Sequence, residues 1–353
     1  MTIAVDAIIT RGSFTVTVAA QFEPGTVVAV LGPNGSGKST LLRAIAGLQP
    51  ISEGTIRIDD MVVDDAGREF VTPQGRAVGL VPQDYALFPH LTVRDNVAFG
   101  PRSRGAKRRA AAELADATLT RLGICDLADR KPGQISGGQA QRVALARALA
   151  TEPAILLLDE PLAALDVESR DAVRAELDIH LSTFEGCTIL VTHDPLDALL
   201  LADRVLVIED GRIVQDGTPA DLAHQPATAY VAALMGVTLL RGSAHGGVLT
   251  VDGGGVLHIA DAEESGRVQC VVRPESVTLH RQLPEGSARN IWQGIVGSLQ
   301  PSHDRVRVLI EGAPAVVAVV TPAAVAELGL VKGTPVWMSM KAVDLAVYRS
   351  PAH

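Results

Sequence analysis

Short apolar runs, separated by turns that contain glycine or proline, fill the first quarter of the chain. The runs are rich in β-branched residues, and segments such as Glu23–Gly25 separate one run from the next. Runs of this length and composition are typical of strands. They predict strands at Ile3–Ile9, Phe14–Phe22, Val27–Leu31, Gly54–Ile58 and Ala77–Val81.

The pattern becomes helical between Thr92 and Ala150, where alanine, leucine and arginine dominate. The loop Lys131–Gln139 interrupts this region and leads into a predicted helix at Ala140–Ala150. We therefore expect a largely helical subdomain at about residues 92–150.

Two further apolar runs follow, Ala154–Leu158 and Thr188–Thr192, and a helix signal after Ala164–Asp166 lies between them. Strands that are buried on both faces of a parallel sheet have such continuous apolar runs. Strands that alternate with helices predict an α/β fold for this part of the chain.

The composition changes after a short helical segment in Pro219–Met235, and glycine and valine dominate from Leu239 onward. Many short strands with glycine between them predict a small all-β barrel. The boundary is expected at residue 235, which gives domains 1–235 and 236–353. The predicted strands of the second domain are Gly247–Val251, Val268–Val272, Val277–His280, Gly294–Leu299, Val306–Ile310, Val316–Val320 and Val336–Met340.

Composition narrows the classes of protein to be considered. A length of 353 residues fits two domains, and the net charge of −9 gives no electrostatic reason to expect nucleic acid as a partner. The three cysteines are far apart in sequence, which suits a reducing compartment. No signal peptide and no apolar run of about 18–20 residues is visible, so we expect a soluble, cytoplasmic chain that needs partner chains for any role at a membrane.

The main candidate for chemistry follows the predicted strand Val27–Leu31. A strand, a glycine-rich turn and a helix start direct backbone N–H groups and the positive end of a helix dipole at one point, where a polyphosphate can bind. The segment fits the P-loop pattern G-x-x-x-x-G-K-S, in which the lysine reaches the β- and γ-phosphates and the serine hydroxyl reaches Mg²⁺. It consists of Gly32, Pro33, Asn34, Gly35, Ser36, Gly37, Lys38, Ser39 and Thr40.

Polar residues also follow three other predicted strands. Gln83 follows Ala77–Val81, where it can reach Mg²⁺ and an attacking water; Asp159 and Glu160 follow Ala154–Leu158, and His193 follows Thr188–Thr192. Carboxylates at these positions can hold a metal shell and orient or deprotonate water. A histidine at a strand end lies on the edge where open α/β sheets bind ligands, although such a histidine alone is more often structural.

Two further features bear on nucleotide binding. Phe14 is expected either to stack on an adenine ring or to pack in the core. Ser136, Gly137 and Gly138 open the predicted helix at Ala140 and form a second anion site at a helix start. One chain has no need of two γ-phosphate sites, whereas two chains that face head to tail do.

In order and spacing, these motifs resemble the nucleotide-binding subunits of ATP-binding cassette transporters. The resemblance covers about residues 1–235, and the loop Ile135–Gln139 makes it specific, although Ile135 replaces the usual leucine. It implies an ATPase with ATP and Mg²⁺, in which Lys38 contacts the β/γ-phosphates and Thr40 the α-phosphate, while Ser39, Gln83 and Asp159 hold the metal. The resemblance assigns the remaining roles as follows: Glu160 acts on water, and His193 holds the γ-phosphate. Asp166 belongs to the Ala-Leu-Asp segment that matches the family, and the residues that cover the partner's ATP are Ser136, Gly137, Gly138 and Gln139.

The segment Gln83–Gly100 resembles the importer subclass, and Arg273–Glu275 resembles the transport-associated domain found after importer cassettes. The last segment is similar to the small molybdate-binding barrels called molbindins, which hold the oxyanion between subunits. Ala324 stands where a serine is common, so weaker binding is expected. The positions that match the oxyanion-binding pattern are Ser287, Arg289, Thr321 and Lys341.

The resemblance implies a dimer of cassettes, two integral-membrane permease subunits that hold the chain at the cytoplasmic face of the membrane, and an extracytoplasmic binding protein. The molbindin-like tail favours molybdate as cargo, with tungstate hard to distinguish. Sulfate, ferric iron, polyamine or sugar remains the alternative cargo. A soluble cassette ATPase acting on DNA or ribosomes is disfavoured, because the chain has one P-loop, no paired cysteines and a negative net charge.

Overall fold

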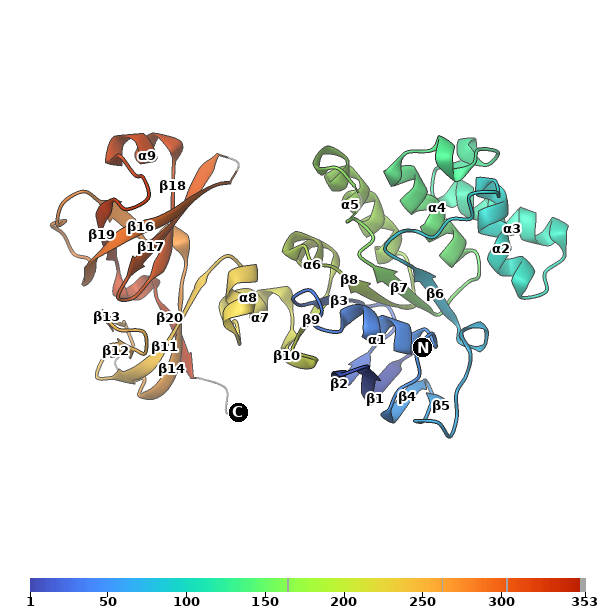
Figure 1. Ribbon diagram of the computed structural model, residues 1–353, viewed down its shortest axis with the longest axis horizontal. Coiled ribbons are helices and arrows are strands. Elements are labelled where there is room, and N and C mark those ends of the chain that lie inside the picture. Colours follow the sequence, from blue (N-terminus) through green and yellow to red (C-terminus); the bar gives the residue numbers. More distant parts are fainter. Residues whose placement is uncertain (164, 262, 303, 350–353) are drawn as a thin grey trace. The chain divides into compact units, whose positions relative to one another are not determined.

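The structure, a computed structural model, describes residues 1–163, 165–261, 263–302 and 304–349. The chain divides into two compact units, Met1–Pro219 and the part from Ala220 onward (Figure 1). The predicted Ala164 lies outside the described residues. Each unit has its own hydrophobic core, as the sequence pattern indicates.

The first unit is built on a ten-stranded sheet in the order β5-β4-β1-β2-β10-β9-β3-β8-β7-β6. Its strands β9, β3, β8, β7 and β6 run parallel, whereas β1, β2, β4 and β5 pair antiparallel. The strands are β1 (Ile3–Arg11), β2 (Phe14–Phe22), β3 (Val27–Leu31), β4 (Glu53–Ile58), β5 (Met61–Asp64), β6 (Val78–Val81), β7 (Ile155–Asp159), β8 (Cys187–Val191), β9 (Arg204–Glu209) and β10 (Arg212–Gly217).

The continuous apolar runs lie where the pattern predicts, in the middle of the parallel part. All five residues of β3 and of β8 are buried, and so are the first four residues of β7. The predicted strand Ala154–Leu158 is thus confirmed as a buried parallel strand. Because the strands are parallel, their polar carboxyl ends lie on one edge of the sheet.

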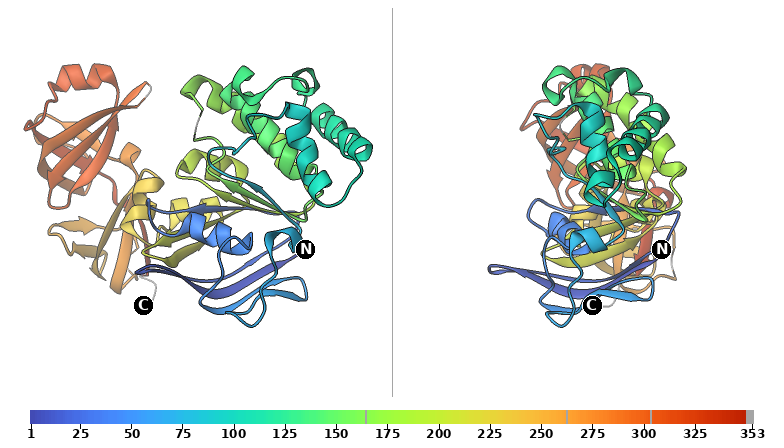
Figure 2. Two further views of the ribbon diagram at one scale, coloured as in Figure 1. Left: turned by 45° about the vertical axis from the view of Figure 1, so that its right-hand side comes forward. Right: turned by 90° about the vertical axis from the view of Figure 1, so that its right-hand side faces the viewer.

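The helices of this unit differ in position and role. The P-loop helix α1 lies between the parallel strands and the antiparallel ones, while α2, α3 and α4 lie together beyond β6 and form the predicted helical subdomain (Figures 1 and 2). Their bounds are α1 (Lys38–Ile45), α2 (Val93–Ser103), α3 (Arg108–Arg121), α4 (Gly137–Leu149), α5 (Val167–Ser182) and α6 (Pro195–Leu201).

A buried arginine holds the carboxyl end of α1. Arg76 is fully buried, and its guanidinium donates hydrogen bonds to the carbonyls of Ala44 at 2.7 Å and Ile45 at 2.9 Å. It also donates to Val63, and Asp64 lies 3.8 Å away. The last carbonyls of a helix have no partner within the helix, so Arg76 satisfies them and fixes the helix that begins at the P-loop.

The second unit contains two five-stranded sheets, β13-β12-β11-β14-β20 and β15-β19-β16-β17-β18, and its all-β class matches the prediction. Helix α9 (Pro322–Leu328) follows β18. The strands are β11 (Thr238–His245), β12 (Val248–Val251), β13 (Val256–His258), β14 (Gly266–Val272), β15 (Thr278–His280), β16 (Asn290–Ser302), β17 (Arg305–Gly312), β18 (Val316–Val320), β19 (Pro335–Met340) and β20 (Ala346–Arg349).

The short helices α7 (Pro219–His224) and α8 (Ala229–Leu234) connect the two sequence regions. The hydroxyl of Tyr348 on β20 donates to the carbonyl of Pro226 at 2.8 Å, and Arg241 donates to Ala227 at 3.2 Å. Because of these bonds, the helical segment belongs to the same compact unit as the β-strands. The boundary between the two compact units therefore lies after Pro219, before residue 235. The domain boundary at residue 235 stays a prediction. Across the described part of the chain, every helix is too short or too polar to cross a membrane.

Candidate active site

The P-loop lies at the carboxyl end of β3, as predicted, and leads into α1. Gly37 precedes α1 with a φ of 107°, and a Cβ atom there would lie 2.4 Å from Cγ2 of Val16. A Cβ atom on Gly32 would lie 2.1 Å from the carbonyl oxygen of Ile208. These two positions require glycine for conformation and for space, which explains their place in the motif.

The lysine of the motif is directed back over the loop. Lys38 is buried, and its Nζ donates to the carbonyl oxygens of Gly32 and Pro33, both at 2.8 Å. Burial lowers the pKa of Lys38, while the nearby carboxylates of Glu160 and Asp159 act in the opposite direction. The ammonium group is thus held at the centre of the site.

The loop offers donors that its own residues leave free. The buried Oγ of Ser36 has no hydrogen-bond partner among the described residues. The first amides of α1 also lack partners within the helix, since a helix satisfies its first N–H groups only from outside. Together with Lys38 these groups form a set of donors at a helix start, which fits the phosphates of a nucleotide.

Ser39 and Asp159 join the P-loop helix to the end of β7. The hydroxyl of Ser39 donates to Oδ1 of Asp159 at 3.0 Å. Burial is the largest cause of a raised pKa for Asp159; the bond from Ser39 lowers that pKa, and Glu160 raises it. Both side chains line a pocket of about 440 Å³ that Gln83 also lines. A hydroxyl, a carboxylate and an amide oxygen here are a ligand set that suits Mg²⁺.

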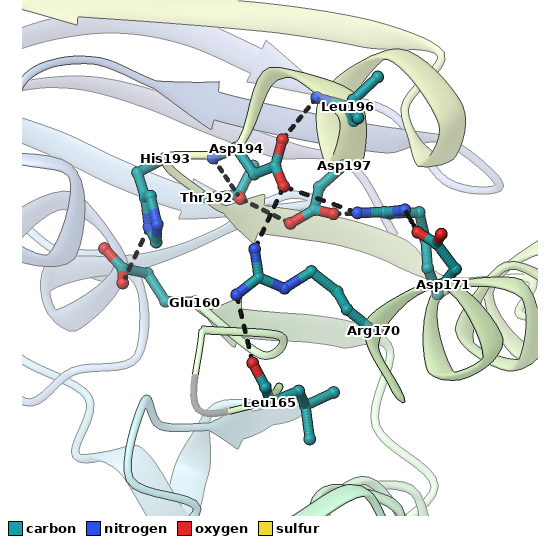
Figure 3. Close-up of polar contacts among 10 residues, drawn as sticks. Glu160, Leu165, Arg170, Asp171, Thr192, His193, Asp194, Leu196 and Asp197 are labelled. Carbon is teal, nitrogen blue, oxygen red and sulfur yellow. Dashed lines mark hydrogen bonds and ion pairs between the residues drawn. The ribbon is translucent and has the colours of Figure 1, made fainter. Parts of the chain in front are cut away.

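The Glu160 carboxylate is the point where three strand ends meet. Its Oε2 accepts a hydrogen bond from Nε2 of Gln83 at 3.2 Å. The same oxygen lies 3.3 Å from Nδ1 of His193, as Figure 3 shows. The Glu160 backbone has a φ of 49°, and its N–H donates to the carbonyl of Val191 at 2.9 Å. This conformation is unusual for a non-glycine residue and directs the side chain away from the strand.

Phe14, at the start of β2, lies beside the P-loop. The side chain is half-buried and packs against the core of the first unit. Its Cε1 lies 3.4 Å from the position of a Cβ atom on Gly37. The ring therefore contributes to the core and keeps part of its surface next to the loop. Stacking on adenine stays a prediction.

The second predicted anion site opens α4. Ser136 caps the helix: its hydroxyl accepts the N–H of Gln139 at 3.3 Å, and the Gln139 side chain accepts the N–H of Ser136 at 3.0 Å. Ser136 and Gly137 are exposed, while Gly138 is half-buried. Asp166 is also exposed. This reciprocal cap fixes the helix start, and the exposed Ser136 and Gly137 leave that start accessible from outside the chain.

The four predicted oxyanion residues do not form one cluster within a chain. Ser287 and Arg289 precede β16 and Lys341 follows β19, and these strand ends are adjacent because Asn290 pairs with Met340. Thr321 follows β18 and is aligned with the other end of β16, about 35 Å along the strand. Its hydroxyl caps α9 by accepting the N–H of Ala324 at 3.1 Å. An oxyanion site that uses both groups requires two chains.

The sequence did not indicate the contacts that hold the loops of Gln83 and His193. Arg147 on α4 donates to the carbonyls of Tyr85 at 2.7 Å and Ala86 at 2.6 Å, and both of these residues have positive φ. A buried network with Asp197 at its centre holds the His193 loop (Figure 3). The charged residues in these helices were visible in the sequence, but the pattern does not show which loop they contact.

Comparison with known proteins agrees with this geometry. The ABC transporter family model matches residues 16–163, and the TOBE domain model matches residues 286–347. The molybdenum import ATP-binding protein ModC of Mycobacterium tuberculosis is 41% identical over 93% of this chain and 92% of the relative. A sulfate/thiosulfate import ATP-binding protein, CysA 2 of Chromobacterium violaceum, is 39% identical over 93% of this chain and 89% of the relative.

A third relative, the sn-glycerol-3-phosphate import ATP-binding protein UgpC of a Jannaschia species, is 40% identical over 71% of this chain and 72% of the relative. Among solved structures, the ATP-binding cassette MJ0796, described as a dimer in a post-hydrolysis state with ADP and Pi, matches with a TM-score of 0.53 and 29% identity. That match covers 62% of this chain and 99% of the cassette.

The fold and the P-loop site define a P-loop ATPase. The chain belongs to the ATP-binding cassette transporter family, with a TOBE domain after the cassette. Within that family it is an import ATPase, which couples hydrolysis of ATP to transport.

The raised pKa of Asp159 leads to a stability prediction. A raised pKa in the folded state means that folding favours the neutral carboxyl, so the ionised form destabilises the fold at pH 7. Asp159→Asn keeps an acceptor for Ser39 and removes the charge. We expect a higher Tm at pH 7 together with lost ATPase activity.

The gain in Tm should shrink as the pH falls through the raised pKa, because the wild-type carboxyl then becomes neutral as well. Differential scanning calorimetry of both proteins between pH 4 and 8 measures this, with the exposed Asp126→Asn as the matched control. A lower Tm for Asp159→Asn at pH 7 would contradict the assignment of burial as the main cause.

Proposed function

We propose that this chain is the ATP-hydrolysing subunit of a molybdate importer. The observation that supports molybdate as the cargo is the similarity to a molybdenum import ATP-binding protein. That similarity covers 93% of the chain, including the β unit that follows the cassette. Tungstate, a tetrahedral dianion of the same kind, is part of the proposal. Sulfate is the second candidate, since a sulfate/thiosulfate import relative matches the same share of this chain.

In the proposed mechanism, the P-loop binds and neutralises the phosphates. Lys38 is placed over the loop to contact the β- and γ-phosphate oxygens, and Ser36 and the first amides of α1 supply further donors. Thr40, in the first turn of α1, serves the α-phosphate. Such donors, fixed before the nucleotide arrives, need little reorganisation when charge shifts during hydrolysis.

Ser39, Asp159 and Gln83 would hold Mg²⁺, because their oxygens line one pocket and Ser39 already contacts Asp159. When bound, the ion supplies charge neutralisation between the phosphates. Glu160 accepts the proton of the attacking water, while Gln83 and His193 hold that carboxylate from two sides. In this proposal His193 also contacts the γ-phosphate.

The exposed helix start at Ser136–Gly138 is proposed to complete the nucleotide site of a second cassette. Ser136 and Gly137 are exposed, and the capping box fixes the helix start that they form. The exposed Asp166 belongs to the same proposed interface. Support comes from the similar cassette MJ0796, whose structure is described as dimeric. Two permease subunits would hold the pair at the cytoplasmic face of a membrane, and an extracytoplasmic binding protein would deliver the anion.

The composite site predicts an ATP-dependent dimer that Glu160→Gln stabilises. The amide keeps the size of the side chain but cannot accept the proton of water, so ATP should bind without turnover. Size-exclusion chromatography with light scattering, with ATP and Mg²⁺, should show a dimer that disappears without ATP. Glu185→Gln, an exposed carboxylate far along the chain, is the matched control and should turn over ATP normally.

A second substitution tests the head-to-tail arrangement. Gly137→Asp suits a helix start, where a carboxylate is favourable, so the fold should tolerate it. The added charge would face the partner's γ-phosphate and repel it. The Glu160→Gln/Gly137→Asp variant should therefore stay monomeric with ATP. A dimer of undiminished stability would contradict the proposed interface.

If the C-terminal β unit binds the cargo anion, the cargo should inhibit its own import. Lys341 and Arg289 at one end of the sheet and Thr321 at the other supply cationic and hydroxyl donors that two chains can combine around a dianion. An anion that binds the open arrangement of the two cassettes more tightly than the closed one opposes their closure. The size of this effect equals the difference between its binding free energies for the two arrangements. Molybdate should therefore lower the ATPase rate of the assembled transporter.

Lys341→Met should weaken this inhibition, whereas Lys332→Met, another exposed lysine of the same unit, should leave it unchanged. The measurement is ATPase activity titrated with molybdate, sulfate and phosphate. Stronger inhibition by sulfate than by molybdate would favour the second cargo. Inhibition that survives Lys341→Met and Arg289→Gln unchanged would contradict a sensor at this end of the tail.

A further inference from the structure

A single arginine connects two loops of the active site that are far apart in sequence. One guanidinium nitrogen of Arg170, on the first turn of α5, donates to the carbonyl of Leu165 at 3.3 Å (Figure 3). The other lies 3.5 Å from Oδ2 of Asp194. Leu165 directly precedes Asp166, and Asp194 directly follows His193. Arg170 thus spans from the segment after Glu160 to the loop that carries His193.

The position of His193 is set through its neighbours. The hydroxyl of Thr192 donates to Oδ2 of Asp197 at 2.9 Å and accepts the N–H of Asp194 at 3.1 Å. Oδ1 of Asp194 accepts the N–H of Leu196 at 2.9 Å and so caps α6. The His193 side chain is half-exposed, and its Nδ1 lies 3.3 Å from Oε2 of Glu160. Restraints on Thr192 and Asp194 therefore decide where the imidazole lies.

Two arginines of α5 contact this loop in different ways. Arg174 is buried, donates to Oδ1 of Asp197 at 2.8 Å and lies 3.6 Å from Asp194. Its contacts secure the loop to α5 alone. Arg170 contacts Asp194 and also the Leu165 carbonyl, so it joins the loop to the segment on the other side of Glu160. Its side chain is about three-quarters buried, which limits screening of the ion pair.

We propose that Arg170 is a positioning residue that ties the Leu165–Asp166 segment to the His193 loop, so that a displacement of that segment changes the position of His193 against Glu160. The inference rests on the proposed catalytic role of His193 and Glu160. A planar guanidinium can satisfy two acceptors at once, whereas a lysine ammonium would act as a point charge. Because Asp166 is exposed and part of the proposed interface, contact with a second cassette would be relayed to the His193 loop.

The test compares Arg170→Met and Arg170→Lys with the wild-type chain in steady-state ATP hydrolysis. Arg170→Met keeps much of the length of the side chain and loses both contacts. We expect kcat to fall about tenfold, because small misplacements of catalytic groups slow the chemical step, with little change in KM for ATP. Arg170→Lys keeps a charge for Asp194 but cannot bridge, so it should recover only part of kcat. The cooperativity of hydrolysis with respect to ATP should weaken in both variants.

Asp194→Asn removes the ion pair from the other side and keeps an oxygen for the α6 cap. Asp194 also lies near Arg174, so the comparison needs both single variants. If Arg170 acts through Asp194, the double variant Arg170→Met/Asp194→Asn should lose clearly less kcat than the product of the two single losses. Glu176→Gln, on α5 like Arg170, is the matched control. It breaks the 3.4 Å ion pair between Glu176 and Arg142 of α4, a pair that is separate from the contacts of Arg170 with Leu165 and Asp194, and it should leave kcat unchanged.

The outcomes separate this inference from the proposed function. Normal kcat and cooperativity in Arg170→Met, in a background where His193→Ala lowers turnover, would overturn the role of Arg170 alone. Normal turnover in His193→Ala would overturn the proposed site itself. Additive losses in the double variant, or a loss of kcat that follows only a lower Tm in all Arg170 variants, would show a structural role and reject the relay.

Discussion

The parallel order β9-β3-β8-β7-β6 imposes the constraint on which the active site depends. Parallel strands end on the same edge of the sheet, so residues far apart in sequence become neighbours there. Asp159 is the last residue of β7, and the other site residues follow strands of this set: Lys38, Gln83, Glu160 and His193. The antiparallel strands and the helical subdomain support this edge, and Arg76 fixes the far end of α1.

The edge concentrates negative charge, and burial makes that charge costly. Asp159 has a raised pKa because it is buried, and Glu160 lies close to it. The charge of Lys38 interacts favourably with both carboxylates, although burial lowers the pKa of Lys38. Without a ligand, these buried charges contribute little to the stability of the fold. They suit the binding of a polyphosphate with a divalent cation. The burial of the Asp159 carboxylate is thus unfavourable for folding but useful for binding and chemistry.

Much of this edge could be predicted because each residue lies directly after an apolar run. The strands Phe14–Phe22 and Val27–Leu31 have the predicted bounds, and β7 and β8 begin within one residue of the predictions. Tertiary contacts were beyond reach: no spacing shows that Gln83 and His193 share the Glu160 carboxylate, or that Arg170 reaches Asp194. In the β unit, Thr321 was interpreted only as a ligand, although a threonine before proline also predicts the helix cap that it forms. Very short strands such as β13 depend on pairing and left no clear pattern.

The central claim is that this edge of the sheet binds ATP through the P-loop lysine. The most direct test is the equilibrium affinity for ATP of Lys38→Ala, measured by calorimetry beside the wild-type chain and the exposed control Lys107→Ala. Loss of a charge-assisted contact should weaken binding at least about tenfold in Lys38→Ala, with a folded protein by circular dichroism, and leave Lys107→Ala unchanged. Equal affinity in all three proteins would contradict the account.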